Sequence, residues 1–260
     1  MVELEKGFLK RGKIVIRLNK YLSEAGITSR RGADKLIESG SVKVDGKRAT
    51  LGMSVDETMV ITVAGKQVGG PVKKIVLAFN KPRGIICTEN PRERKNIIKF
   101  INYPKRITYA GRLDKDSEGL MIMTNDGDLI HYIMKSGNLH EKEYRVTLDQ
   151  EITPEFIQAM ENGVHIQDEE KNLDQITRKA KVTQVGKYTF DIVITQGLNR
   201  QIRRMCKALG YEVKKLKRTR IMNILLADLP VGKIRELKPE ELEELYGREQ
   251  KNEGASLPFK

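Results

Sequence analysis

One short segment of the sequence combines acidic and basic residues in a way that could carry chemistry. Asp114 lies between Arg112 and Lys115 in the string AGRLDKDSEGL, residues 110–120. Nearby cations keep a carboxylate ionised, and an ionised Asp can act as a nucleophile or a base. Glycines bracket the string between two strand-like segments, which predicts a loop that presents functional side chains. On composition alone, an ordinary charged turn is the simpler interpretation.

A second candidate segment is the string QGLNRQIRRMC, residues 196–206. Its apolar residues are spaced as the buried stripe of a helix over residues 199–209, which Gly210 would end. The basic side chains of the segment lie outside this stripe. The turn at Gly197 leads into the N-terminus of the helix, where free backbone N–H groups can bind an anion. We therefore expect this segment to bind a phosphate or an ionised Asp, although a merely solvated basic helix is the alternative.

Two Asp-x-Asp pairs, at residues 114–116 and 126–128, raise the possibility of a magnesium-dependent nuclease. Asp126 and Asp128 stand directly before a helical pattern, where Asp is an ordinary N-cap or first-turn residue. The three histidines are far apart in the sequence, and the two cysteines form no CxxC motif. We therefore expect no metal site.

The charge of the chain points to a polyanionic partner. Among 260 residues, 48 are Lys or Arg and 35 are Asp or Glu, which gives a formal net charge of +13. Nucleic acid and acidic membrane surfaces both attract such a protein. Residues 200–220 alone hold nine basic residues and one acid, Glu212. We interpret this stretch as a phosphate-contacting surface.

Several classes of protein do not fit the sequence. No apolar run approaches the ~20 residues that span a bilayer, and the N-terminus lacks the apolar core of a secretory signal. Two cysteines do not make a disulfide framework. We expect a cytoplasmic protein with reduced thiols and no membrane association, and no feature demands anything beyond a monomer.

The patterning predicts an α+β protein with two domains. Residues 1–15 read as a basic arm, and residues 16–67 as a small domain of two helices, the second capped by Ser29, with a small curled sheet. A linker over residues 68–73 leads to a second domain over residues 74–246, in which strands and helices mix on a largely antiparallel sheet. The tail, residues 247–260, is expected to be disordered.

The motifs GRLDKDSEGL, KEY and NRQIRRM, followed by residues 213–221, resemble the RsuA-type branch of the pseudouridine synthases in order and spacing. The resemblance covers nearly the whole chain, and residues 17–67 resemble the S4 RNA-binding domain that precedes the catalytic domain in that branch. The strings HEKEY, QGLNRQIRRMC and KRTRIMN are most similar to synthases that act on large-subunit ribosomal RNA. The family loop often has Thr at the position of Ser117, and both are small hydroxyl residues.

The resemblance implies a reaction that needs no cofactor or metal. A pseudouridine synthase breaks the C1′–N1 bond of a uridine, rotates the base, and reattaches it through C5 after flipping it out of the stack. The catalytic Asp of the family falls on Asp114. The resemblance leaves two roles open for it, addition to C1′ or proton removal along a glycal route. Tyr144 falls where the family places an aromatic against the base, and Arg203 on the arginine that pairs with the catalytic Asp. Ile202 and Leu216 would line the pocket.

The resemblance also implies that RNA is the partner, with large-subunit ribosomal RNA as substrate and a transfer RNA as a further candidate. Asn80, Lys81 and Pro82 resemble the first motif of the catalytic domain, which we interpret as structural support. The residues expected to contact RNA are Arg17, Lys20, Arg30, Arg31 and Lys35 in the first domain, and Arg112, Leu113, Lys115, Gln196, Gly197, Leu198, Asn199, Arg200, Gln201 and Arg204 in the second. A non-catalytic S4-type RNA-binding protein is the main alternative.

Overall fold

The computed structural model describes residues 15–69, 72–168 and 173–254. The chain divides into two compact units, residues 1–73 and 74–260, and each is described by itself. The basic arm predicted over residues 1–15 lies outside the described residues except for Val15. Among the described residues, no helix combines the length and the apolar character needed to cross a membrane.

The first unit packs two helices against short strands around a small apolar core that includes Leu18, Leu22 and Ile37. Ser29 caps the second helix as predicted, because its Oγ accepts the Gly32 N–H at 3.1 Å. The elements are β1 (Ile16–Arg17), α1 (Leu18–Glu24), α2 (Arg30–Glu38), β2 (Val42–Val44), β3 (Lys47–Arg48), β4 (Ser54–Val55), β5 (Ile61–Val63) and β6 (Lys66–Gln67). Strands β3-β2-β5-β6 form one sheet, and β1 pairs with β4.

Val68 belongs to the first unit and not to the linker predicted over residues 68–73. Its N–H donates to the Ile61 carbonyl at 2.9 Å, and its side chain is buried against the core. A buried valine stabilises the unit that it packs on. Residues 70 and 71 of the predicted linker lie outside the described residues.

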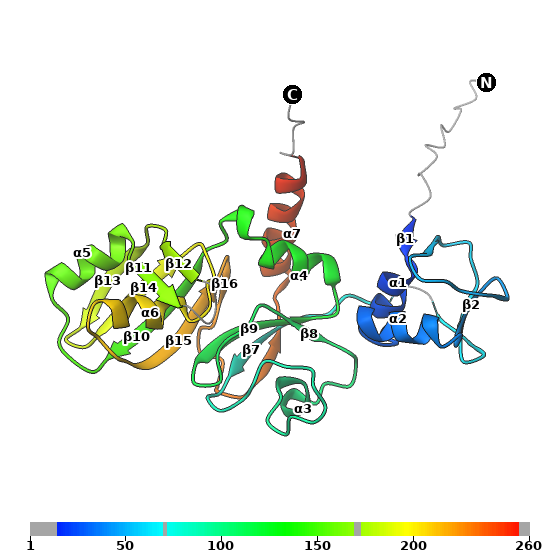
Figure 1. Ribbon diagram of the computed structural model, residues 1–260, viewed down its shortest axis with the longest axis horizontal. Coiled ribbons are helices and arrows are strands. Elements are labelled where there is room, and N and C mark those ends of the chain that lie inside the picture. The colour runs from blue at the N-terminus through cyan, green and yellow to red at the C-terminus, as the bar shows by residue number, and fades with distance from the viewer. Residues whose placement is uncertain (1–14, 70–71, 169–172, 255–260) are drawn as a thin grey trace, which may run out of the picture. The chain divides into compact units, whose positions relative to one another are not determined.

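The second unit is built on a nine-stranded sheet (Figure 1). Its strands run in the order β13-β14-β10-β15-β9-β7-β17, with β16 paired to β15 and β8 paired to β9. They are β7 (Val76–Lys81), β8 (Thr108–Ala110), β9 (Glu118–Thr124), β10 (Lys142–Leu148), β13 (Lys181–Gly186), β14 (Thr189–Ile194), β15 (Val213–Ile221), β16 (Ile224–Leu225) and β17 (Ile234–Glu236). All pairs are antiparallel except β9 with β15. The predicted α+β fold class is confirmed. A separate hairpin pairs β11 (His165–Asp168) with β12 (Leu173–Ile176).

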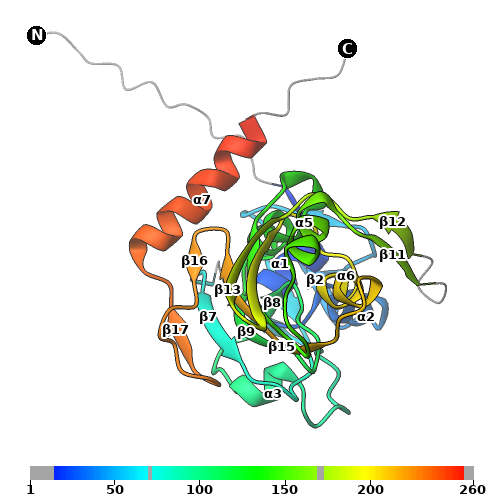
Figure 2. The same cartoon turned by 90° about the vertical axis from the view of Figure 1, so that its left-hand side faces the viewer.

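Helices cover both faces of this sheet (Figure 2). Strand β7 is a continuous apolar run because its alternate side chains enter two cores, Leu77 and Phe79 on one face and Val76 and Ala78 on the other. The core with Leu77 includes residues of α3 (Ile97–Ile101), α5 (Pro154–Asn162) and α6 (Gln201–Ala208). The core with Val76 includes residues of α4 (Gly127–Met134) and α7 (Pro239–Gly254), and the short 3-10 turn Ser136–Asn138 follows α4.

Two predicted boundaries differ from the structure at the C-terminal side of the chain. The tail expected to be disordered from residue 247 is helical as far as Gly254. One glycine within a helix costs about 1 kcal/mol relative to alanine, and the surrounding Glu, Arg and Lys residues favour helix. The basic helix predicted over residues 199–209 spans Gln201–Ala208.

The loop predicted over residues 110–120 is shorter than expected, because Glu118 already begins β9. Gly119 pairs in parallel with Arg218 of β15, and its φ of +108° is a conformation that side-chain-bearing residues rarely adopt. A Cβ at this position would lie 2.6 Å from the backbone N of Arg218 and closer still to its carbonyl oxygen. Gly119 therefore allows the two halves of the sheet to join.

We expect Gly119→Ala to destabilise the second unit by about 2–4 kcal/mol, because it adds both strain and a backbone clash. Gly127→Ala is the matched control, since nothing lies within 4 Å of a Cβ there and its φ is not positive. Urea denaturation followed by circular dichroism measures both. Equal midpoints for the two variants would contradict the role assigned to Gly119.

Candidate active site

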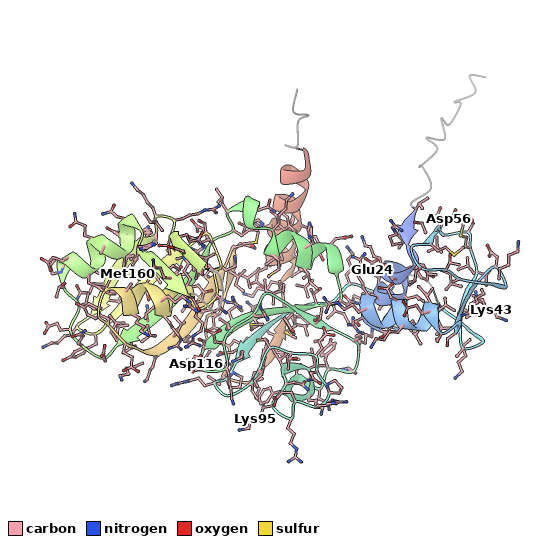
Figure 3. The ribbon with its side chains drawn as sticks, in the orientation of Figure 1. Glu24, Lys43, Asp56, Lys95, Asp116 and Met160 are labelled. Atoms are coloured by element: carbon pink, nitrogen blue, oxygen red, sulfur yellow. The ribbon has the colours of Figure 1, made fainter. Side chains whose placement is uncertain are left out.

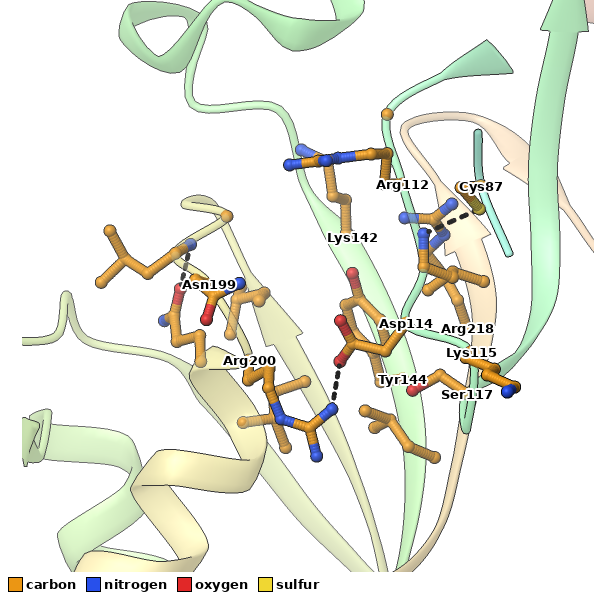
Figure 4. A pocket seen from close by; sticks show the side chains of 18 of the residues that line it. Cys87, Arg112, Asp114, Lys115, Ser117, Lys142, Tyr144, Asn199, Arg200 and Arg218 are labelled. Carbon is orange, nitrogen blue, oxygen red and sulfur yellow. Dashed lines mark hydrogen bonds and ion pairs between the residues drawn. The ribbon is translucent and has the colours of Figure 1, made fainter. Parts of the chain in front are cut away.

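A cavity of about 430 Å³ opens in the second unit, within the size range of small-molecule sites (Figure 4). Distant parts of the chain meet here: the loop after β8, the strands β10 and β15, and the turn into α6. Twelve of the residues predicted for the site line it, namely Arg112, Leu113, Asp114, Lys115, Tyr144, Gly197, Leu198, Asn199, Arg200, Gln201, Ile202 and Leu216.

The loop that carries Asp114 is held by the ammonium group of Lys81 at the end of β7. Lys81 is fully buried, and its Nζ donates to the carbonyl oxygens of Pro82 at 3.0 Å, Asp114 at 3.1 Å and Ser117 at 2.8 Å. Burial lowers the pKa of Lys81. The Leu113 N–H also approaches the Cys87 Sγ, at 3.5 Å. These contacts fix the backbone on both sides of Asp114.

The carboxylate of Asp114 forms an ion pair with Arg200, with Nη1 and Oδ2 3.4 Å apart (Figure 4). The expected partner was Arg203, and this expectation is wrong. Arg203 instead contacts the Asp116 Oδ2 at 3.2 Å and also donates to the Ser117 Oγ and the Val213 carbonyl. Arg200 reaches Asp114 because it lies in the turn before α6, with a left-handed φ of +50°.

Asp116 lies near the middle of the second unit (Figure 3) and joins both arginines. Burial raises the pKa of the Asp116 carboxyl, but the hydrogen bond from Arg200 and the charges of Arg200 and Arg203 outweigh it, so that the pKa falls below its ordinary value. Asp116 therefore stays ionised and anchors the N-terminal end of α6 to the Asp114 loop.

Three predicted residues of the second unit lie outside the lining of the cavity: Gln196, Arg203 and Arg204. The Gln196 side chain accepts the Arg178 N–H. Arg204 binds the carboxylate of Asp168 and donates to the Asn199 carbonyl at 2.9 Å. Arg204 thus ties α6 to the hairpin of β11 and β12.

The deep wall of the cavity is formed by residues of the sheet and of α6. Tyr144 is 8% exposed, Ile202 4% and Leu216 7%. Tyr144 pairs across the strands with Arg218. The side chains of Tyr144, Ile202 and Leu216 thus give this wall an aromatic ring and two aliphatic groups, which are the kind of surface that packs against a planar ring.

Sequence reasoning missed two cations of this wall, Lys142 on β10 and Arg218 on β15. Both stand in strings already quoted for the resemblance, and Lys142 lies two residues before Tyr144, on the same face of its strand. Arg218 is 2% exposed, and its Nε donates to the Leu120 carbonyl at 2.7 Å. Burial and the charge of Arg218 lower the pKa of Lys142 to about 8.

The basic residues predicted for the first unit lie mostly at its surface. Arg30, Arg31 and Lys35 on α2 are exposed. Arg17 is exposed too and donates to the Gly52 carbonyl, while Lys20 pairs with Glu24 at 3.7 Å.

The Asp pair at residues 126–128 has a structural role, as predicted. Asp126 accepts the N–H groups of Asp128 and Leu129 at 3.1 and 3.3 Å and so caps α4. Its carboxylate also binds Lys74 at 2.6 Å and the Tyr246 hydroxyl at 3.0 Å. Within the described ranges, no group of three or more His, Cys, Asp or Glu residues could hold a metal ion.

The loop that carries Asp114, the strand residue Tyr144 and helix α6 all lie within the part of the chain that matches a known family model. The family model described as RNA pseudouridylate synthase matches residues 75–208, and the S4 domain model matches residues 16–61. The chain belongs to the RNA pseudouridine synthase family.

Among curated relatives, the dual-specificity RNA pseudouridine synthase RluF of Escherichia coli (strain K12) is 50% identical over 233 residues, which cover 89% of this chain and 78% of that protein. An uncharacterized RNA pseudouridine synthase of Mycobacterium leprae is 33% identical over 95% of this chain and 98% of that protein. Among solved structures, a pseudouridylate synthase matches with a TM-score of 0.64 and 29% identity, covering 88% of this chain and 99% of that one.

We expect the Lys142 amine to titrate near pH 8 in the free enzyme, against about 10.4 for an ordinary lysine, because burial and Arg218 disfavour its charged form. The reaction rate of Lys142 with an amine-directed label, followed by peptide mass spectrometry, should rise with pH along a curve centred there. Lys142→Arg removes the labelled peptide and serves as the control. A midpoint near 10.5 would contradict the assignment.

Proposed function

We propose that this chain isomerises a specific uridine of large-subunit ribosomal RNA to pseudouridine, with Asp114 as the catalytic carboxylate. The observation that carries the proposal is the position of Asp114: its carboxylate lines the cavity, pairs with Arg200, and stands on a loop clamped by Lys81. Membership in the family supplies the reaction class. The name of the E. coli relative contains "dual-specificity", which supports a second RNA substrate, and we propose a transfer RNA for this role.

The reaction begins when the target nucleotide leaves the helix stack and enters the cavity, at a cost of a few kcal/mol. The base packs against Tyr144, between the walls made by Ile202 and Leu216. Arg112 is exposed at the rim, where it fills the space vacated by the base or holds a phosphate. The remaining RNA contacts come from the cations and backbone of the turn at residues 196–201.

The C1′–N1 bond then breaks, and its electron pair stays with the uracil ring. Two routes for Asp114 remain open. In the first, its carboxylate adds to C1′, and C5 of the rotated base later displaces it from C1′. In the second, a carboxylate takes a proton from C2′ so that a glycal forms, and C2′ regains this proton as C5 bonds to C1′. In both, the base rotates, C5 bonds to C1′, the C5 proton is lost, and N1 gains a proton. The position of Tyr144 in the cavity lining supports a part for it in proton removal from C5.

The resemblance assigned the pairing with the catalytic Asp to Arg203 alone, and we propose that Arg200 and Arg203 each perform a part of this role. Arg200 contacts the Asp114 carboxylate directly, with Nη1 and Oδ2 3.4 Å apart, and so orients it toward the cavity. Arg203 acts as a positioning residue, because its guanidinium binds Asp116, Ser117 and Val213, and so joins the loop, α6 and β15.

The first unit serves as a docking module for RNA. Its exposed cations on α2, together with Arg17 and Lys20, suit phosphate contacts that read RNA shape more than duplex sequence. We place the protein in the cytoplasm as a monomer. Both cysteines are buried free thiols, which agrees with a reducing compartment.

We expect Asp114→Asn to lower turnover at least about 10³-fold while RNA binding survives, since the change removes only the charge of the catalytic group. Tritium release from RNA transcribed with 5-³H-uridine measures turnover, because attachment through C5 expels the label. Large-subunit rRNA, small-subunit rRNA, tRNA and precursor ribosomal particles are assayed in parallel. Asp116→Asn removes one charge from the same loop and should cause a much smaller loss.

Retained turnover in a pure preparation of Asp114→Asn would contradict the assignment of Asp114 as the catalytic carboxylate. Binding without tritium release from any RNA or particle would favour a non-catalytic S4-type RNA-binding protein instead.

We expect the triple variant Arg30→Ala, Arg31→Ala and Lys35→Ala to weaken RNA binding and to flatten its salt dependence. Each phosphate contact on single strands contributes about 0.7 to the slope of log K against log salt, so the slope should fall by about 2. Filter binding at salt concentrations from roughly 50 to 300 mM, the range in which phosphate contacts respond to salt, measures this slope. An unchanged slope would remove α2 from the RNA interface.

A further inference from the structure

The cavity has many more positive than negative side chains. Five cationic residues line it, Arg112, Lys115, Lys142, Arg200 and Arg218, and Asp114 is the one carboxylate among the described lining residues. Asp114 is already engaged by Arg200. In the parts of the chain that the structure describes, no carboxylate lies within ion-pair distance of Lys142 or Arg218.

These cations lie at two depths. Arg112 and Lys115 are exposed, and the Arg200 side chain is 43% exposed, so all three stand at the rim. Arg218 is 2% exposed and lies across the strands from Tyr144, and Lys142 is half-buried on the same face. In Figure 4, Arg218 and Lys142 are drawn on the other side of Asp114 from Arg200. Rim cations suit RNA phosphates, whereas a base packed on Tyr144 would reach the two deep ones.

An uncompensated buried cation is costly, because desolvation disfavours charge. The same cost appears in the lowered pKa of Lys142. Arg218 is held in place by hydrogen bonds to the Leu120 carbonyl and the Met121 sulfur, neither of which is charged. The arrangement is therefore complementary to a negative charge that the substrate brings or develops.

We propose that Lys142 and Arg218 form an anion subsite for the uracil ring at the moment when the C1′–N1 bond breaks. The electron pair of that bond stays with the base, and the ring spreads the negative charge over N1, O2 and O4. The charge disappears when C5 bonds to C1′, the C5 proton leaves and N1 takes up a proton. Preorganised cations at a developing charge lower the barrier of the step that creates it. The inference rests on the proposed function and adds two residues to it.

The other groups that share the cavity with Lys142 determine how it titrates. They are Cys87, Arg112, Asp114 and Lys115 from the loops, Tyr144 from its own strand, Arg200 from the turn before α6, and Arg218 from β15. Burial and, after it, the charge of Arg218 lower the pKa of Lys142 to about 8, so the amine loses its proton above that pH. The kcat/KM of the free enzyme should therefore fall as pH rises through this value, and the limb should be absent in Lys142→Met.

The test compares single-turnover rates of the full chain on a minimal RNA substrate at saturating enzyme. Lys142→Met should lower the rate about 10²-fold and leave the RNA dissociation constant within about 3-fold. Lys142→Arg and Arg218→Lys keep the charge and should retain most of the rate. Lys187→Met, at a 58% exposed surface lysine paired with Glu151, is the matched control and should behave as wild type.

A substrate with 5-fluorouridine at the target separates a charge effect from a structural one. Fluorine makes the departing base more acidic, so it carries the negative charge with less help, and the defect of Lys142→Met should shrink about 10-fold or more. The readout is the disappearance of 5-fluorouridine from nuclease digests. A defect of equal size on both substrates would overturn the proposal.

Two further outcomes would also overturn it. Weaker RNA binding with a normal rate at saturation would make Lys142 a phosphate contact, and wild-type behaviour in both measurements would leave it without a role. If Arg218→Lys fails to fold by circular dichroism, the Lys142 series decides. Failure of the proposed function is distinguishable, because turnover would then be missing in wild type or would survive Asp114→Asn.

Discussion

The site depends on one buried ammonium group. Within the described residues, the Lys81 ammonium donates to no carboxylate and is satisfied instead by three carbonyl oxygens, those of Pro82, Asp114 and Ser117. Because a buried charge must be fully hydrogen-bonded, these carbonyls have little freedom to move. The backbone around Asp114 is therefore fixed from the interior of the sheet, while its carboxylate faces the cavity and Arg200 in the turn before α6.

The cavity exists because two sheet segments meet at a single parallel pair. Strand β9 carries the Asp114 loop at its start, and β15 carries Leu216 and Arg218. Gly119 lets the two backbones approach closely at this point. Helix α6 then closes the site from one face, with Arg203 bound to both the loop and β15. One geometric junction thus determines the distance between the carboxylate, the aromatic wall and the cations.

Much of this could be predicted from residue patterns. The capping residues Ser29 and Asp126 marked their helices, and the motifs brought Asp114, Tyr144, Ile202 and Leu216 into one site. The partner of Asp114 was predicted incorrectly, since it depends on the left-handed turn at Arg200, which local pattern does not reveal. Lys142 and Arg218 were missed because their proximity arises from cross-strand register and from a parallel pair between segments about 100 residues apart.

The late position of β15 in the chain has a consequence for synthesis on the ribosome. Strands β9 and β10 follow one another in the sequence but are separated in the sheet by β15, residues 213–221. Until that segment emerges, the facing edges of β9 and β10 have no partner between them, and half of the site does not exist. The first unit, residues 1–73, is by then long complete. A nascent chain therefore completes its RNA-docking unit well before its catalytic unit. During the interval between these two events, the edges of β9 and β10 are unpaired, and pairing of these edges with other chains would lead to aggregation.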